Sequence, residues 1–275
     1  MGAALSCALF CMLPAVRCNI RRLQNQFAFH PPYPTYSLTP DGGALTWASG
    51  VQPPSSLPGI SIQTTFVTSA RGNRVAIFHY VRQGAQLTLL WSHGNAMDCG
   101  ECVELLQLMA HRLNVNVIAY DYAGYGASSG SPTEAGTYAD IEAVHNYANG
   151  CGVHEGSLYL PQISHPLPLP IPVSCAPIRS KSRCGVPDEK LVICGQSVGS
   201  GPSLWLTERH PALRGLFLMS ALTSGLRVLS PAPFCSKAGF CGPPYAFICC
   251  DIFPNHRRLP KVRDRPSART PSTSQ

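Results

Sequence analysis

The stretch Leu191-Val-Ile-Cys-Gly-Gln-Ser197-Val-Gly-Ser-Gly-Pro-Ser-Leu-Trp-Leu-Thr-Glu-Arg-His210 decides the predicted fold. Apolar, partly β-branched residues run into Gly195-Gln-Ser-Val-Gly199, and apolar residues at helical spacing follow. The order of strand, tight turn and helix is typical of a G-x-S-x-G elbow, which presents its serine above the sheet. An ordinary glycine turn is the alternative, because the bare motif often occurs by chance. The flanking strand and helix favour a nucleophile and make Ser197 the candidate catalytic residue.

The residues around this elbow predict strands and helices in alternation. The expected strands cover residues 62–68, 74–82, 86–91, 115–120 and 191–194. The expected helices cover about 100–112 and 132–148, besides the helix after the elbow. This alternation predicts an α/β domain whose mostly parallel sheet has helices on both faces.

Length and composition fit one α/β domain, but proline clusters mark segments outside its packed part. The chain has 275 residues, 45% hydrophobic and 13% charged, with 26 prolines. Prolines are concentrated in residues 30–59, where we expect an extended linker, and in residues 151–184. We therefore place the α/β domain at residues 60–255, with an insertion at 151–184.

The formal net charge of +7 is concentrated at the two ends of the chain. Most of the excess lies from His256 onward, and arginines in the first 40 residues supply the rest. A near-neutral body with basic ends suits a membrane surface better than a nucleic-acid interface, so we expect no nucleic-acid partner. We expect residues 256–275 to be a basic, disordered tail.

Residues 1–29 resemble a membrane-anchoring segment. The opening Met1-Gly2-Ala-Ala-Leu-Ser6 fits the N-myristoylation pattern, and Cys7, Cys11 and Cys18 follow as candidates for S-acylation. One acyl chain binds a bilayer marginally, whereas two hold firmly. A cleaved apolar leader or a chance Met-Gly start is the alternative. Since no uninterrupted apolar run of spanning length exists, we expect peripheral attachment through acyl groups on Gly2 and the cysteines.

The cysteine and glycine motifs predict neither a metal nor a cofactor. The C-x-x-C at Cys99-Gly-Glu-Cys102 lacks a second pair at zinc spacing, so coincidence is favoured. The glycine-rich Asp121–Gly130 stretch is not a dinucleotide fingerprint and is expected to be a turn at the carboxyl end of the sheet.

Four motifs together resemble one family: Ser92-His-Gly-Asn-Ala96, Asp121-Tyr-Ala-Gly-Tyr-Gly-Ala-Ser-Ser-Gly130, Gly195-Gln-Ser-Val-Gly199 and Leu222-Thr-Ser-Gly-Leu-Arg227. They are similar to those of the α/β-hydrolase-domain 17 family of serine hydrolases. The resemblance implies an α/β-hydrolase fold, acyl-mediated attachment to the cytosolic face of plasma or endosomal membranes, and removal of palmitate from S-acylated membrane proteins. A looser similarity to serine aminopeptidase-like hydrolases leaves a general esterase or peptidase as the alternative.

The hydrolase reading assigns a role to each candidate site residue. Ser197 would attack a thioester carbonyl, and the backbone N–H groups of Val198 and Asn95 would hold the oxyanion. We expect His93 to be structural, because in this fold the base follows the serine in chain order.

Two features depart from the family pattern. The 151–184 insertion, which a lid or an unspliced segment would explain, interrupts a connection that is expected to be short. The triad acid and base are expected after two further strands, yet Asp251 and His256 are too close in sequence to supply both. We therefore expect the last strands to be missing and only about 10³–10⁴-fold acceleration over water to remain. A catalytically inactive, membrane-attached binding protein is the further alternative.

Overall fold

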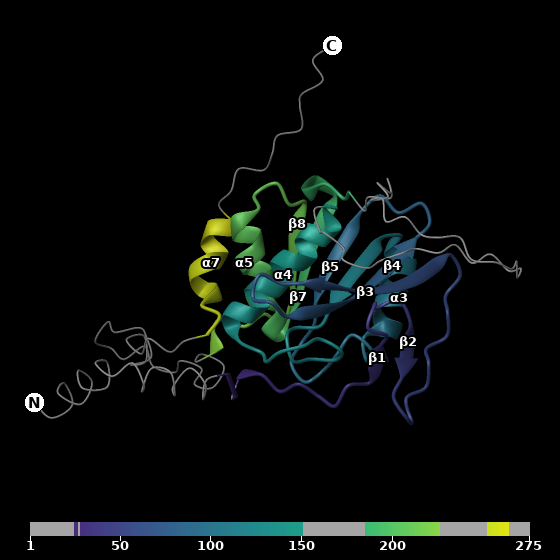
Figure 1. Cartoon of the computed structure of the whole chain (residues 1–275). Coiled ribbons are helices and arrows are strands. Elements are labelled where there is room, and N and C mark those ends of the chain that lie inside the picture. Colours follow the sequence, from purple (N-terminus) through teal and green to yellow (C-terminus); the bar gives the residue numbers. More distant parts are fainter. Residues whose placement is uncertain (1–24, 27, 151–184, 226–251, 264–275) are drawn as a thin grey trace, which may run out of the picture.

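The computed structural model describes residues 25–26, 28–150, 185–225 and 252–263 (Figure 1). In these residues one large sheet of six strands has the order β3-β4-β6-β5-β7-β8. The strands are β3 (Ile60–Thr68), β4 (Arg74–Arg82), β5 (Thr88–Ser92), β6 (Asn116–Tyr120), β7 (Leu191–Gln196) and β8 (Gly215–Met219). The first three in sheet order pair antiparallel, and β6, β5, β7 and β8 pair parallel. The sheet is therefore mixed and mostly parallel.

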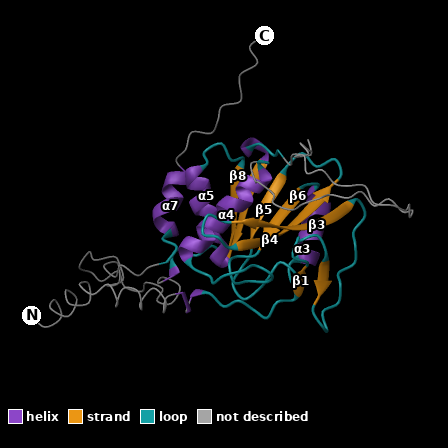
Figure 2. Cartoon of the chain, in the orientation of Figure 1, coloured by secondary structure: helices purple, strands orange, loops and turns teal. Residues whose placement is uncertain are grey.

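The helices cover both faces of this sheet, as Figure 2 shows. They are α3 (Val103–Leu113), α4 (Glu134–Ala148), α5 (Ser200–Arg209) and α7 (Asn255–Arg263), with the short 3-10 turns η1 (Asp188–Lys190) and η2 (Ser197–Gly199). Strand residues alternate between two cores: Leu90 of β5 packs with α4 and α5, whereas Trp91 packs with α3. The predicted fold class, an α/β-hydrolase sheet with helices on both faces, is confirmed.

Local sequence signals account for the ends of α4. The Thr133 side chain accepts a hydrogen bond from the Gly136 N–H at 2.9 Å, which satisfies one of the free donors of the first turn. Ile141 and Val144 lie on the buried face, one turn apart. The predicted helix 132–148 is thus found two residues shorter at its start.

The segment expected to be an extended linker, residues 30–59, has structure of its own. It contains the strand pair β1 (Tyr36–Leu38) and β2 (Leu45–Trp47). Tyr36 is buried, its ring meets Phe78 edge to face, and its hydroxyl donates to Asp121. The linker prediction therefore needs correction, because an aromatic side chain fixes this proline-rich segment to the domain.

The basic tail predicted from residue 256 also needs correction, because its first part is helix α7. Glu208 on α5 pairs with Arg258 at 3.4 Å and with Lys261 at 2.5 Å. The Arg258 guanidinium also donates to the Tyr138 hydroxyl at 2.8 Å. Two of the cations that suggested a solvated tail instead connect α7 to the neighbouring helices.

Several predictions fall on residues outside the described part of the chain. These are the acylation candidates Gly2, Cys7, Cys11 and Cys18, the insertion 151–184 and residues 264–275. Within the described residues, no helix has the length and apolar character needed to cross a bilayer.

Candidate active site

Ser197 lies at a backbone bend with the geometry of a nucleophile elbow. Its φ of +51° is in the left-handed region, which non-glycine residues rarely adopt. A Cβ on Gly195 would lie 2.6 Å from the Ser203 hydroxyl, and one on Gly199 would lie 2.3 Å from the Ser92 carbonyl oxygen. Glycine is therefore required on both sides of the serine, which explains the spacing of the motif.

The parallel register brings the elbow beside the loop expected to form the oxyanion hole. Ser92, the last residue of β5, pairs with Gly195 of β7, so the segments that follow the two strands leave the sheet at the same edge. Gly94 in the loop is next to the Gln196 side chain, since a Cβ there would be 3.6 Å from it. The nucleophile and the loop residues 93–96 are thus neighbours in space.

Side-chain hydrogen bonds hold Asn95 in this loop. Its side-chain oxygen accepts from the Tyr125 hydroxyl at 2.6 Å and from the His30 backbone N–H at 3.0 Å. Its side-chain nitrogen donates to the Ala28 carbonyl at 2.9 Å. The side-chain amide of Asn95 is therefore engaged in structural hydrogen bonds, and the predicted oxyanion donor stays its backbone N–H.

His93 holds the same loop in place through buried contacts. It is fully buried, its Nε2 lies 3.3 Å from Asp121 Oδ1, and its carbonyl accepts from the Tyr122 hydroxyl at 2.6 Å. Asp121 also accepts from the Cys99 backbone N–H at 2.9 Å. The Asp121–Gly130 turn thus supports the oxyanion loop through its buried carboxylate and tyrosines.

Val198 offers the second expected donor. It is the middle residue of η2, which continues into α5, and the first N–H groups of a helix have no acceptor within it. The positive end of the α5 dipole lies at the same place. A tetrahedral oxyanion above Ser197 would meet favourable partial charge there.

For five of the described histidines, the side-chain partner is a residue other than Ser197. These pairs are His79 with Tyr147, His93 with Asp121, His145 with Asp188, His210 with Glu142 and His256 with Thr223. His210 and His256 would be the first candidates for a base by chain order, and their rings are engaged by Glu142 and the Thr223 carbonyl. The arrangement therefore supplies a presented serine and an oxyanion loop, without a base on its hydroxyl among these five histidines.

The C-x-x-C thiols are buried under α3. Cys99 and Cys102 are unpaired, and burial raises the pKa of Cys102 to about 12. A thiol that ionises so poorly is a weak nucleophile and metal ligand at neutral pH.

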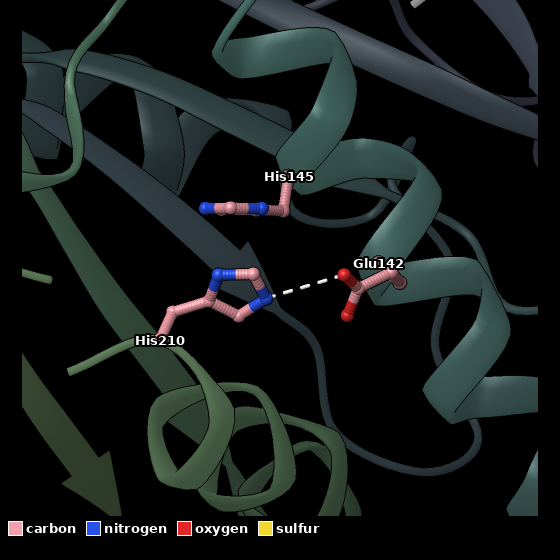
Figure 3. Close-up of side chains that lie close together, drawn as sticks. All are labelled: Glu142, His145 and His210. Atoms are coloured by element: carbon pink, nitrogen blue, oxygen red, sulfur yellow. Dashed lines mark hydrogen bonds and ion pairs between the residues drawn. The ribbon is translucent and has the colours of Figure 1, made fainter. Parts of the chain in front are cut away.

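A cluster that the sequence analysis missed lies at the far end of α5. Glu142 and His145 on α4 face His210, which caps α5 (Figure 3). Asp188 in η1 accepts from His145 Nε2 at 2.8 Å. Glu142 and His145 stand at an i, i+3 spacing that indicates a shared face, but His210 lies 65 residues beyond His145, so the pattern alone could not find it.

The fold, with its glycine-flanked elbow, defines the class of the protein as an α/β-hydrolase. No family model matches the chain. It is 32% identical over 262 residues to alpha/beta hydrolase domain-containing protein 17B of Homo sapiens, covering 93% of this chain and 74% of that protein. It is 28% identical to protein 17C of Mus musculus over 287 residues, covering 93% and 75%. The chain therefore belongs to the alpha/beta hydrolase domain-containing protein 17 family.

Among nematode proteins, alpha/beta hydrolase domain-containing protein aho-3 of Caenorhabditis elegans is 32% identical over 261 residues, covering 94% of this chain and 64% of that protein. Two solved structures are also similar. A predicted CIB-like hydrolase from Thermoplasma acidophilum has a TM-score of 0.40 at 19% identity, covering 62% of this chain and 68% of its own. An alpha-beta hydrolase from Vibrio vulnificus has a TM-score of 0.43 at 16% identity, covering 66% and 52%.

Proposed function

We propose that this α/β-hydrolase is a serine hydrolase of the protein S-palmitoyl thioesterase type. The observation that carries the proposal is the left-handed backbone of Ser197 between two glycines that cannot be replaced without a clash. A serine held in this strained conformation by the surrounding structure is a feature of functional sites. It presents its hydroxyl toward a bound acyl group rather than into the core.

The proposed reaction begins when Ser197 Oγ attacks the thioester carbonyl carbon and its proton passes to solvent water. The backbone N–H groups of Val198 and Asn95 hold the negative carbonyl oxygen of the tetrahedral intermediate. Its collapse breaks the carbon–sulfur bond, and the leaving thiolate takes up a proton. Water then cleaves the acyl-serine ester, which releases the fatty acid and restores the hydroxyl.

Acyl anchors would bring this site to its substrates. In the proposal, Gly2 is myristoylated and at least one of Cys7, Cys11 and Cys18 is S-acylated, which attaches the protein to the cytosolic face of plasma or endosomal membranes. The substrates are S-acylated proteins of the same membrane. Confinement to one surface raises the effective concentration of the enzyme near them.

The test is hydrolysis of a soluble fluorogenic palmitoyl-type thioester by the purified full chain, after its folded state has been checked by circular dichroism. Ser197→Ala is the active-site variant, and Ser131→Ala, at an exposed serine, is the matched control. We expect wild type and Ser131→Ala to hydrolyse the thioester and Ser197→Ala to have lost this activity. Hydrolysis that is unchanged in Ser197→Ala would refute it.

A second assay separates the thioesterase from the general esterase or peptidase. The same proteins are compared on an oxygen ester and an amide of matched acyl chain. For a thioesterase, the ratio of the enzymatic rate on the thioester to that on the oxygen ester should exceed the ratio of their uncatalysed hydrolysis rates in water. If the oxygen ester or the amide is preferred, the broader hydrolase is the correct activity. A folded chain with no Ser197-dependent turnover on any of the three would instead be a binding protein.

A further inference from the structure

The cluster at the end of α5 brings three side chains with metal-binding groups together. One ligand atom each of Glu142, His145 and His210 lies within 4.8 Å of the others. Glu142 Oε1 is 3.2 Å from His210 Nε2, and the centres of the two imidazole rings are 4.2 Å apart. Figure 3 shows the two rings and the carboxylate converging from α4 and from the end of α5.

One of these groups is buried with an unused nitrogen. The His145 side chain is only 3% exposed, and its Nδ1 has no hydrogen-bond partner. Nε2 lies 2.8 Å from Asp188 Oδ1, a carboxylate oxygen that accepts, which favours the imidazole proton on that nitrogen. The Asn149 side-chain nitrogen, 3.1 Å from Nε2, donates to the same carboxylate oxygen. Nδ1 therefore carries a free lone pair in a site where water does not reach it. A buried polar atom without a partner calls for an explanation, and a bound ion is one of the usual ones.

The Glu142 carboxylate has the same property. Its Oε1 faces His210 Nε2, while its Oε2 is buried without a partner. The side chains of Glu142 and His210 are 33% and 25% exposed, so the cluster is reached from solvent on this side. Two unsatisfied acceptor atoms from neighbouring turns of α4 are what a bound cation would satisfy.

We propose that Glu142, His145 and His210 bind a divalent transition metal ion, with zinc as the best-fitting member of the class. Two imidazoles and a carboxylate suit zinc, whereas magnesium and calcium prefer sites made entirely of oxygen ligands. Ligand bonds of about 2.0–2.2 Å require the three groups to draw closer together than they are here, which rotation of the partly exposed Glu142 and His210 side chains supplies.

Asp188 acts as the positioning residue of this site. Metal-binding histidines commonly donate their second ring N–H to a carboxylate, which fixes the tautomer and makes the ligand nitrogen more basic. The hydrogen bond from His145 Nε2 to Asp188 Oδ1 is such a contact. Asp188 Oδ2 is also 4.0 Å from His210 Nδ1, so the same carboxylate faces the second imidazole.

The bound metal would tie α4 to the end of the helix that begins after Ser197. His210 caps the carboxyl end of α5, whose first turn follows the elbow. The ion therefore lies a full helix length from the serine and takes no part in its chemistry. Its role is to stabilise the folded state, since a ligand that binds only the folded chain raises its stability.

The test is a calorimetric titration of the full, reduced chain with Zn²⁺, paired with thermal unfolding. Because a free thiol elsewhere in the chain can also take up zinc, the decisive quantity is the difference between variants. Wild type is expected to bind one more equivalent of Zn²⁺ than Glu142→Gln or His210→Gln does. In these two variants the affinity for Zn²⁺ at this site should fall more than about 100-fold. Asp188→Asn should weaken binding about 10–100-fold. His111→Gln on α3 is the matched histidine control and should match wild type.

Two further measurements identify the ligands and the ion. Co²⁺ in the same site should give visible absorption typical of nitrogen and oxygen ligands, and this absorption should disappear in His210→Gln. Mg²⁺ should not raise the melting temperature. Equal zinc titrations of wild type, Glu142→Gln and His210→Gln would overturn the proposal, as would an equal loss in His111→Gln. Because His210 is partly exposed, we expect His210→Gln to fold. Circular dichroism verifies this before the comparison.

Discussion

The Tyr125 hydroxyl donates a 2.6 Å hydrogen bond to the side-chain oxygen of Asn95, which links the glycine-rich turn to the oxyanion loop. The same hydroxyl accepts from the His30 backbone N–H at 3.1 Å, so the segment before β1 joins this contact. The loop that carries a proposed oxyanion donor is therefore positioned by residues from two other parts of the chain.

We expect Tyr125→Phe to reduce kcat for thioester hydrolysis about tenfold with little change in KM. The lost hydrogen bond costs about 1 kcal/mol and loosens Asn95, whose N–H acts mainly on the transition state. Tyr147→Phe is the control, because Tyr147 contacts His79 on another part of the fold. A fall in melting temperature shared by both variants, with no selective loss of kcat in Tyr125→Phe, would contradict the positioning role.

Gly199→Ala is expected to destabilise the protein by about 1–3 kcal/mol and to abolish Ser197-dependent activity. The new methyl group would lie 2.3 Å from the Ser92 carbonyl oxygen and 2.8 Å from that of His93, and backbone atoms cannot move aside cheaply. Urea unfolding measures the loss. Gly215→Ala is the matched control, because nothing lies within 4 Å of a Cβ there. Equal stability of the two variants would show that the elbow is not so closely packed against the loop.

His79 should make the protein less stable in acid. Burial lowers the pKa of His79 to about 4 in the folded state, against an ordinary value of about 6.5 when unfolded. Between pH 4 and 6.5 the unfolded chain binds more protons at His79 than the folded chain does. The contribution of the buried, neutral His79 to stability is therefore full above about pH 6.5 and is lost as the pH falls toward 4. We expect this contribution to be on the order of 3 kcal/mol.

The corresponding measurement is the free energy of unfolding from pH 7.5 to 4.5 in wild type and in His79→Gln. The variant should lose less stability over this interval, whereas His256→Gln, at a partly exposed position, should follow wild type. Parallel curves for wild type and His79→Gln would show that the buried imidazole is not responsible.

Glu208→Gln should loosen α7 by about 0.5–1 kcal/mol, since Glu208 pairs with both Arg258 and Lys261. Hydrogen exchange of the α7 amides reports this opening directly. The difference from wild type should shrink in 1 M salt, where screening weakens partly exposed ion pairs. A difference that is independent of salt would indicate that packing, and not charge, holds the helix.

The membrane-anchor proposal predicts that the variant with Cys7→Ser, Cys11→Ser and Cys18→Ser moves from the membrane fraction to the supernatant of expressing cells. Myristoylation alone gives marginal binding, so loss of the second signal should release most of the protein. Cys194→Ser, at a buried thiol, is the control and should stay with wild type. Unchanged membrane binding of the triple variant would disprove S-acyl anchoring.

The central fold could be predicted from the sequence because its signals are local. The apolar runs that end at Tyr120 and Cys194 are buried strands, and the glycines around Ser197 already require a tight bend. The neighbourhood of Ser197 and Asn95 followed from the rule that parallel strands end at one edge of the sheet.

The rest could not be predicted because it depends on contacts between distant residues. Tyr36 and Asp121 are 85 positions apart, and their contact turns a proline-rich linker into part of the domain. Likewise, α7 could not be predicted because its own sequence shows charges and a proline without an apolar stripe. Its contacts with Glu208 and Tyr138, far away in the sequence, hold it in place. His210 and Glu142, 68 positions apart, meet only after α5 has packed on α4.

Strand β5 has a neighbour on each side, and all five of its residues are buried. Local opening of a protein begins where few buried contacts must break, so a central strand exchanges its amide protons among the last. The predicted oxyanion loop leaves from the end of β5 and the elbow from the end of its neighbour β7, so we expect both to start in the part of the sheet that exchanges last. Opening elsewhere in the sheet is therefore expected to precede loss of the pairing between Ser92 and Gly195, which keeps the starts of the two loops together.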